Sequence, residues 1–299
     1  AARNFTMATH FKTVGLIGKA NHDATAGTVT ALYAFLQQQD CNIFVEETVA
    51  NNIQDPDKQV TDLVSLGQVC DLVIVVGGDG NMLGAARVLS RFDVAVIGVN
   101  RGNLGFLADL NPDDFESTLA EVLAGQYQTE MRYLLDVSIY RHQVVKANNS
   151  AMNEVVLHAD KVAHMIEFEA FIDGSFVFHQ RSDGLIICTP TGSTAYSLSG
   201  GGPIVHPKLD AMTLVPMFPH SLTSRPLVID ADSEVRILVS KENDAQLQVS
   251  CDSHIMLSVL PGDELVIKKH KSALRMVHPV KHDYYDVLRK KLHWGRQNY

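Results

Sequence analysis

Short apolar runs alternate with amphipathic stretches over residues 14–125, and this order leaves few folds open. Each apolar run is short enough for a strand, while the stretches between them repeat apolar residues at helical spacing. Strands that alternate with helices predict a parallel sheet whose two faces are both covered. The predicted strands are residues 14–17, 43–45, 72–76 and 94–99, and the predicted helices are residues 28–36, 58–66, 81–89 and 112–123.

The second half of the chain has a different pattern of apolar residues. From Arg132 onwards, apolar runs follow one another with turn residues between them, which predicts mostly β structure. Asp173-Gly174 separates two such runs and is typical of a two-residue hairpin, because that turn needs positive φ at both central residues. The predicted strands are residues 168–172, 175–178, 185–188, 227–229, 235–239, 247–251, 264–267 and 274–277, followed by a helix at residues 284–292.

The charge balance narrows the class of partner. The chain has 299 residues, with 25 Lys and Arg against 34 Asp and Glu, and a formal net charge of -9. Proteins that bind nucleic acid usually carry a basic stripe, so we expect no nucleic-acid partner. The apolar run at residues 72–76 is far short of the roughly 20 residues that span a bilayer, so we expect no membrane association. The cysteines lack any CxxC spacing, which is typical of reduced thiols and favours a cytoplasmic protein.

The strongest local motif is Gly77-Gly78-Asp79-Gly80, which lies between a predicted buried strand and a predicted helix. In an open α/β sheet, ligands bind outside the carboxyl ends of the strands. Glycine lets backbone N–H groups approach phosphate oxygens, and the helix N-terminus adds partial positive charge, so the motif predicts a phosphate site. It is not a P-loop, because GxxxxGKS/T is absent. The spacing of Gly78, Gly80 and Gly84 is one residue too long for the dinucleotide fingerprint GxGxxG.

Asp79 is unusual in such a site because its carboxylate repels phosphate. Two chemical tasks would account for it: accepting the proton of an attacking hydroxyl, or helping to hold Mg²⁺ on a triphosphate. Alternatively, Asp79 is only a turn residue or a helix cap, where Asp is common. Acidic and basic side chains balance between residues 72 and 110, so phosphate binding there depends on backbone amides, helix dipoles and a metal ion.

A second polar stretch, residues 183–203, joins a predicted strand to a loop rich in hydroxyl residues and glycines. Hydroxyl groups and the Tyr196 ring suit ribose, phosphate and a purine, although a surface loop rich in turn formers has a similar composition. Asn153 and Glu154 open another predicted strand. An amide beside a carboxylate can bind the two hydroxyls of a ribose, or the pair can have a purely structural role.

Five segments occur in one order along the chain: GGDGNMLGA from Gly77, NRGNLGFLADL from Asn100, NEVVLH from Asn153, QRSDGLIICTPTGSTAYSLSGGGP from Gln180 and LVPMFPHSLTSRPLV from Leu214. In this combination they resemble the bacterial NAD kinase family. The similarity extends from about residue 12 to residue 294. The set is highly specific, whereas GGDG alone also occurs in lipid kinases of the diacylglycerol and sphingosine type.

The resemblance implies both fold and reaction. It implies an α/β N-terminal domain over residues 8–130, with a Rossmann-like parallel sheet and the GGDG turn. An all-β C-terminal domain with the NAD-binding loops follows over residues 131–278, and a C-terminal helix and tail over residues 279–299. The implied reaction is phosphorylation by ATP of the 2′-hydroxyl on the adenosine ribose of NAD, which gives NADP and needs a divalent cation. A homodimer or homotetramer is also implied.

The resemblance further implies a role for each site residue. Asp79 is the implied catalytic carboxylate, and no protein ligand to metal is implied, because Mg²⁺ is held mainly through the ATP phosphates. The residues implied to bind the substrates NAD and ATP are Gly78, Gly80, Asn81, Phe106, Asn153, Glu154, His164, Arg181, Asp183, Thr194, Ala195, Tyr196, Ser197, Leu198, Ser199 and His254.

Two other hypotheses stay open at this point. A lipid kinase would use the same GGDG turn, but it would need an amphipathic helix rich in Lys and Arg on one face, and the sequence offers none that is evident. A non-catalytic NAD sensor would keep the pocket without the chemistry, and the presence of Asp79 argues against it.

Overall fold

The computed structural model describes residues 10–19, 23–101, 105–160 and 164–294, and the chain divides into two compact units. Unit 1 combines Ala1–Met131 with Leu274–Tyr299, and unit 2 is Arg132–Ala273. Two long strands, β6 (Tyr127–Arg141) and β17 (Glu264–Pro279), contribute residues to both units. The C-terminal end of the chain is therefore part of the unit that contains its beginning.

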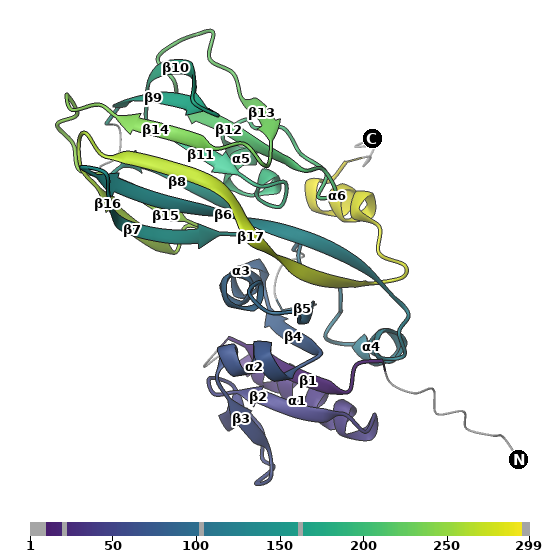
Figure 1. The fold of residues 1–299 in the computed structure, drawn as a ribbon. Helices are drawn as coiled ribbons and strands as arrows, with labels where there is room; N and C mark the ends of the chain where they lie inside the picture. Colours follow the sequence, from purple (N-terminus) through teal and green to yellow (C-terminus); the bar gives the residue numbers. More distant parts are fainter. Residues whose placement is uncertain (1–9, 20–22, 102–104, 161–163, 295–299) are drawn as a thin grey trace, which may run out of the picture. The chain divides into compact units, whose positions relative to one another are not determined.

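Unit 1 is built on a parallel sheet with strand order β3-β2-β1-β4-β5 (Figure 1). The order reverses between β1 (Thr13–Gly18) and β4 (Leu72–Gly77), which pair directly. This parallel strand order confirms the predicted Rossmann-like sheet. Doubly wound sheets bind ligands at such a point of reversal. The end of β17 joins the sheet by pairing with β5. The other strands are β2 (Asn42–Glu46), β3 (Gln59–Thr61) and β5 (Ala95–Asn100).

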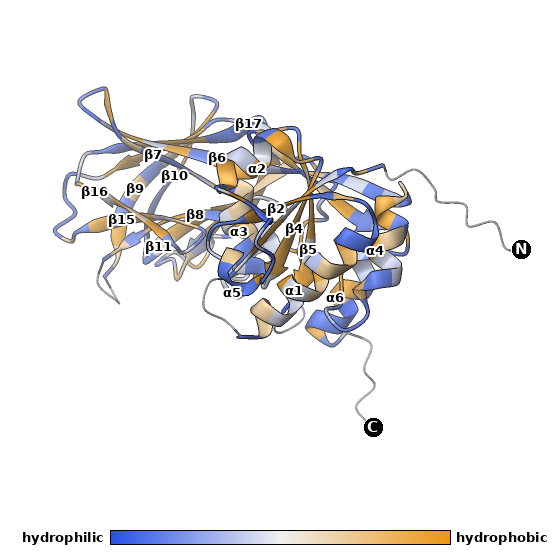
Figure 2. Cartoon of the chain, turned by 90° about the horizontal axis from the view of Figure 1, so that it is seen from below, coloured by the Kyte–Doolittle hydropathy of each residue, from blue (hydrophilic) through white to orange (hydrophobic). Residues whose placement is uncertain are grey.

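Helices cover both faces of this sheet. Helices α1 (Asp23–Gln38) and α4 (Phe115–Leu123) share one core with strand residues such as Leu16 and Ile74. On the opposite face, Leu66 of α2 (Leu63–Val69) lies 3.0 Å from where a Cβ on Gly15 would stand. Figure 2 shows β4 and β5 as largely hydrophobic, as expected for strands covered on both faces. Among the described helices, none is long and apolar enough to cross a membrane.

Unit 2 consists of antiparallel sheets. One has the order β13-β12-β11-β8-β15-β16, and another contains β10-β9-β14 with the beginning of β17. Residues of both sheets, such as Leu157, Leu185, Phe168 and Ile237, share one core, so the sheets pack face to face. The strands are β7 (Val144–Ala151), β8 (Glu154–Ala159), β9 (Ile166–Ile172), β10 (Ser175–Ser182), β11 (Gly184–Cys188), β12 (Ala211–Met217), β13 (Leu227–Asp230), β14 (Val235–Val239), β15 (Leu247–Cys251) and β16 (Ile255–Val259).

Several element predictions need correction. The helix predicted at residues 58–66 is wrong in its first part, because β3 pairs with β2 there and α2 begins only after Asp62. The Asp62 side chain accepts a hydrogen bond from the Ser65 N–H and so caps α2. The two strands predicted at 264–267 and 274–277 are one strand, β17. The hairpin at Asp173-Gly174 is confirmed, with φ of 50° and 79°.

Candidate functional site

The GGDG turn lies at the carboxyl end of β4, beside the reversal of strand order in unit 1. Gly77 has φ of 153°, and a Cβ there would lie 2.4 Å from the Asn81 side chain. Gly78 is the N-cap of α3 (Asp79–Leu89), yet no atom of the residues that the structure describes lies within 4 Å of where its Cβ would stand. The protein itself therefore requires glycine at Gly77, while the space beside Gly78 is open to a ligand.

The Asp79 carboxylate is held by a loop distant in sequence. Its two oxygens accept hydrogen bonds from the backbone N–H groups of Phe106 (3.0 Å) and Leu107 (3.2 Å). A Cβ on Gly105 would lie 2.1 Å from Asp79 Oδ1, so the backbone approaches the carboxylate as closely as glycine permits. Asp79 is not a helix cap, because Gly78 occupies that position. Each carboxylate oxygen retains a further lone pair that can accept a proton.

Unit 1 contains one group of side chains that could hold a metal ion, among the residues that the structure describes. It consists of Asp109, His278 and His282, whose ligand atoms lie within 4.8 Å of one another. The Asp109 oxygens lie 2.5 Å and 2.6 Å from the two imidazole Nδ1 atoms. Tetrahedral zinc with bonds of about 2.0 Å separates ligand atoms by about 3.3 Å, so the observed distances are those of hydrogen bonds.

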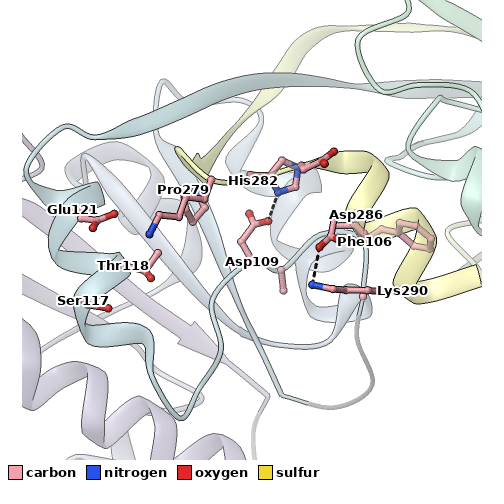
Figure 3. A pocket seen from close by; sticks show the side chains of 14 residues that line it. Phe106, Asp109, Ser117, Thr118, Glu121, Pro279, His282, Asp286 and Lys290 are labelled. Carbon is pink, nitrogen blue, oxygen red and sulfur yellow. Dashed lines mark hydrogen bonds and ion pairs between the residues drawn. The ribbon is translucent and has the colours of Figure 1, made fainter. Parts of the chain in front are cut away.

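A pocket of about 330 Å³ lies beside this group. Figure 3 shows its walls: Phe106 and Asp109 from the loop after β5, Thr118 from α4, and His282 and Lys290 from the C-terminal segment. Lys290 is paired with Asp286 of the same helix, α6 (Tyr284–Leu292), at 2.6 Å. The Lys290 ammonium is thus already held in an ion pair within α6.

In unit 2, the start of β8 is fixed by a buried acidic residue, Asp252. The Asp252 carboxylate accepts hydrogen bonds from the N–H groups of Met152 (2.9 Å), Asn153 (2.7 Å) and Glu154 (3.3 Å). Asp252 is only 2% exposed. Sequence analysis missed Asp252, although its position in the CDSH segment between two strands could have drawn attention to it.

The Glu154 side chain is also buried, and it lacks these donors. Glu154 is 3% exposed. Burial, followed by the nearby charge of Asp252, raises the pKa of Glu154 from 4.5 to about 8. At neutral pH the free protein therefore holds Glu154 mainly in its protonated form, which can donate one hydrogen bond as well as accept one.

The loop after β11 contacts the start of β8 as well. The Thr189 hydroxyl donates to the Met152 carbonyl at 2.6 Å, and a Cβ on Gly192 would lie 2.1 Å from the Asn153 carbonyl oxygen. The Ser193 hydroxyl donates to the Pro190 carbonyl and accepts from the Val205 N–H. Two hydroxyls of the polar stretch, those of Thr189 and Ser193, thus hold the loop itself together.

The six predicted binding residues at 194–199 differ in exposure. The loop forms η2 (Gly192–Thr194) and α5 (Tyr196–Ser199). Tyr196 and Ser199 are exposed, whereas Ser197 is buried beneath Gly202. Thr194, Ala195 and Leu198 are half-buried, and the Thr194 hydroxyl donates to the Thr191 carbonyl.

A pocket of about 480 Å³ in unit 2 brings together His164, Asp183 and Tyr196, three of the predicted residues. Phe218 and Met256 also line it and were not predicted. Phe218 is 80% exposed with φ of 45°, a conformation that bulky residues rarely adopt. An aromatic ring and a thioether beside polar groups suit a planar base.

Most of the other residues predicted in unit 2 lie outside this pocket lining, Arg181 and His254 among them. Arg181 is mostly exposed on β10, where its guanidinium lies 3.8 Å from the Glu167 carboxylate. His254 is exposed in the turn after Asp252, and its N–H donates to the Cys251 carbonyl. Their predicted roles remain predictions.

Comparison with known proteins agrees with the arrangement of motifs in both units. The model of the ATP-NAD kinase N-terminal domain matches residues 14–127, and that of the ATP-NAD kinase C-terminal domain matches residues 152–279. The NAD kinase of Pseudoalteromonas translucida is 62% identical over 294 residues, covering 98% of this chain and all of that protein. The NAD kinase of Aeromonas salmonicida is 60% identical over 290 residues, covering 97% of this chain and 99% of that protein.

Solved structures share the fold. A yeast NADH kinase complexed with NADH aligns with a TM-score of 0.84 at 24% identity, over 96% of this chain and 89% of that one. An Archaeoglobus fulgidus NAD kinase in complex with ATP aligns with a TM-score of 0.71 at 24% identity, over 95% of this chain and all of that one.

The fold and motifs define a phosphotransferase that acts on a nucleotide. The chain belongs to the ATP-NAD kinase family, and it phosphorylates NAD with ATP to give NADP. The resemblance seen in the sequence is confirmed, and the lipid kinase and sensor hypotheses are set aside.

Proposed function

We propose that the chain transfers the γ-phosphoryl group of ATP in line to the 2′-hydroxyl of the adenosine ribose of NAD, with Asp79 as the general base. The observation that carries this proposal is the Asp79 carboxylate held by the Phe106 and Leu107 N–H groups at the end of β4. Phosphoryl transfer passes through a loose transition state and needs positioning more than covalent chemistry. A carboxylate fixed in one orientation can accept the hydroxyl proton as the new P–O bond forms.

The backbone around Asp79 has a separate task in this proposal. The open space beside Gly78 lets a phosphate approach the N-terminus of α3, an 11-residue helix whose dipole favours negative charge. Gly80 and Asn81 occupy the first turn of the same helix. These groups hold the phosphates of ATP, while Asp79 faces the hydroxyl.

A divalent cation such as Mg²⁺ would supply positive charge to balance the ATP phosphates. The Asp109 group is occupied by its own hydrogen bonds, so we propose that the ATP phosphates supply most of the cation's ligands. Without Mg²⁺, ATP should therefore bind at least tenfold more weakly, because little positive charge compensates the triphosphate. Equilibrium dialysis with radiolabelled ATP, with and without Mg²⁺, measures this difference. Equal affinities would contradict the role given to the cation.

The polar groups of unit 2 bind NAD in this proposal. Asn153 and Glu154 contact a ribose, Asp183 lies near the nicotinamide end, and residues 194–199 form a wall against adenosine. This part rests on the 480 Å³ pocket that collects His164, Asp183 and Tyr196, with Phe218 as an added stacking surface. Because many loop hydroxyls bond within the loop, we expect Tyr196 and Ser199 to carry more of the binding than Ser197.

The Asp79→Asn variant tests the base. The amide keeps the size of the side chain but loses the basic oxygen, so kcat should fall by about 10² or more. The dissociation constant for NAD should change by less than a few fold. NADP formation is followed with a NADP-specific dehydrogenase, and NAD binding by calorimetry. Asp93→Asn is the matched control, because the Asp93 side chain is 95% exposed. Wild-type turnover in Asp79→Asn would rule out the assigned role.

We infer that the protein works in the cytoplasm as a homodimer or homotetramer, with no nucleic-acid or membrane partner. The net charge of -9 supports the exclusion of nucleic acid. Light scattering after size-exclusion chromatography measures the assembly, and a single monomeric peak would contradict it.

A further inference from the structure

Two histidines of the C-terminal segment converge on Asp109. His278 lies near the end of β17, and the chain then turns so that the His282 N–H donates to the Pro279 carbonyl at 2.9 Å. The turn stacks the two imidazoles, with ring centroids 4.2 Å apart. Their Nδ1 atoms donate to different oxygens of Asp109, at 2.5 Å and 2.6 Å. Figure 3 shows the His282 bond at the edge of the pocket.

The group of Asp109 and the two histidines is largely buried. The side chains of Asp109, His278 and His282 are 11%, 2% and 12% exposed. Burial alone would raise the pKa of Asp109, but the hydrogen bonds and charges of the two histidines lower it well below its usual range. Asp109 is therefore ionised, and its position depends on both donors. The Glu130 carboxylate lies 3.4 Å from the other nitrogen of His278.

Asp109 belongs to the loop that holds Asp79. Its N–H and that of Leu110 both donate to the Gly98 carbonyl of β5, at 3.1 Å and 3.0 Å. A Cβ on Gly98 would lie 2.7 Å from the Leu107 carbonyl, so the loop packs directly on the strand. Leu107, two residues before Asp109, donates its N–H to Asp79. The segment 105–110 is thus fixed to β5 by its backbone and to the C-terminal segment by the Asp109 side chain.

We propose that His278 and His282 are positioning residues for the phosphoryl transfer. Through Asp109 they hold the Phe106 and Leu107 N–H groups against the Asp79 carboxylate. The C-terminal segment thereby sets the orientation of the general base, although it follows Asp79 by about 200 residues. This inference rests on the proposed role of Asp79.

His282→Phe tests the proposal at the more accessible histidine. Phenylalanine keeps the stacked ring and removes the donor, so kcat should fall about tenfold, since small displacements of a reacting group are costly. The KM values for NAD and ATP should stay within twofold. His282→Asn retains a donor near the Nδ1 position and should recover most of the loss. Lys290→Met is the matched control in the same pocket, and it should keep wild-type turnover. A His282→Phe variant with wild-type kcat would overturn the proposal.

Combining His282→Phe with Asp79→Asn separates this inference from the proposed function. If the histidine acts through Asp79, its effect disappears in the Asp79→Asn background, because the base is already lost. The same tenfold loss in both backgrounds would overturn the positioning role while leaving Asp79 as the base. High activity of Asp79→Asn alone would instead refute the proposed function.

Hydrogen exchange supplies a readout that does not depend on activity. In His282→Phe, the Phe106 and Leu107 amides should exchange at least tenfold faster, while those of β4 stay protected. Unchanged protection of both loop amides would overturn the proposal. Atomic absorption of the purified wild-type protein should find less than about 0.1 equivalent of zinc. Stoichiometric zinc that is lost in His282→Phe would show a metal site in place of the hydrogen-bonded group.

Discussion

The two units place a carboxylate at a strand terminus in opposite hydrogen-bonding environments. In unit 1, Asp79 receives two backbone N–H groups from a loop far along the chain. In unit 2, the N–H groups at the start of β8 go to Asp252, and Glu154 beside them stays buried with a raised pKa. The first arrangement fixes the orientation of a carboxylate, and the second favours a neutral acid.

The difference shows that backbone donors decide the chemistry of an acidic side chain more than its place in a motif does. Asp79 stands in a glycine-rich segment of the sequence, and Glu154 stands in an amide-rich one. Only the fold determines which carboxylate the N–H groups reach. Two glycines at close approaches, Gly105 and Gly192, allow each arrangement to be disturbed separately.

Gly105→Ala should have the largest effect, and the effect should fall on activity. The new Cβ would lie 2.1 Å from Asp79 Oδ1, the tip of a side chain that can rotate away. The fold should survive with its free energy of unfolding changed by less than about 1 kcal/mol. The base should be displaced, and kcat should fall about 10²-fold. The coupled dehydrogenase assay and urea denaturation measure the two quantities. Gly27→Ala is the control, because among the described residues no atom lies within 4 Å of where its Cβ would stand.

Gly192→Ala should act on stability instead. Its Cβ would meet the Asn153 carbonyl oxygen at 2.1 Å and the Asn153 Cα at 2.8 Å, which are backbone atoms that cannot rotate away. We expect a loss of about 3 kcal/mol in the free energy of unfolding, as for other overpacked sites. Thermal unfolding measures this loss. A fully stable Gly192→Ala variant would show that the loop can separate from β8, and the contrast with Gly105 would fail.

Local signals explain which parts of the fold the sequence predicts well. The hairpin at Asp173-Gly174, the strand β14 and the helix α6 follow from turn residues and periodicity within a few positions. The sequence predicts helix at β3 because the three residues of that strand gain their structure only by pairing with β2. Likewise, the sequence predicts two strands in place of β17 because the central residues of β17 are polar.

In the candidate site, too, local motifs predict some residues, whereas others are brought together only by the fold. Asp79 and Glu154 could be chosen from sequence because their motifs are short and continuous. The groups that control them could not, because Leu107 and Asp252 lie 28 and 98 positions away. The main signal for such partners is a glycine where the backbone comes close, as at Gly105, and the sequence alone does not distinguish it from a turn glycine.

Glu154→Gln tests the buried acid of unit 2 through the pH dependence of the free energy of unfolding. The pKa of Glu154 is about 8 in the folded protein, above its ordinary value of 4.5, so the folded state keeps a proton that the unfolded state releases. The contribution of Glu154 to stability is therefore fully present below pH 4.5 and is lost as pH rises towards 8. Between pH 5.5 and 7.5 this costs the wild type roughly 2 kcal/mol, which the uncharged glutamine avoids.

The measurement is the free energy of urea unfolding at pH 5.5 and 7.5 for the wild type, Glu154→Gln and the exposed control Glu242→Gln. Comparing differences between the two pH values removes the shared groups that do not interact with Glu154. Asp252 and Cys188 are its ionisable neighbours, so the measured difference includes their coupling to Glu154. Glu242→Gln should follow the wild type, while Glu154→Gln should decline less. Parallel decline in all three would contradict the raised pKa of Glu154 and would mean that hydrogen-bond donors reach its carboxylate.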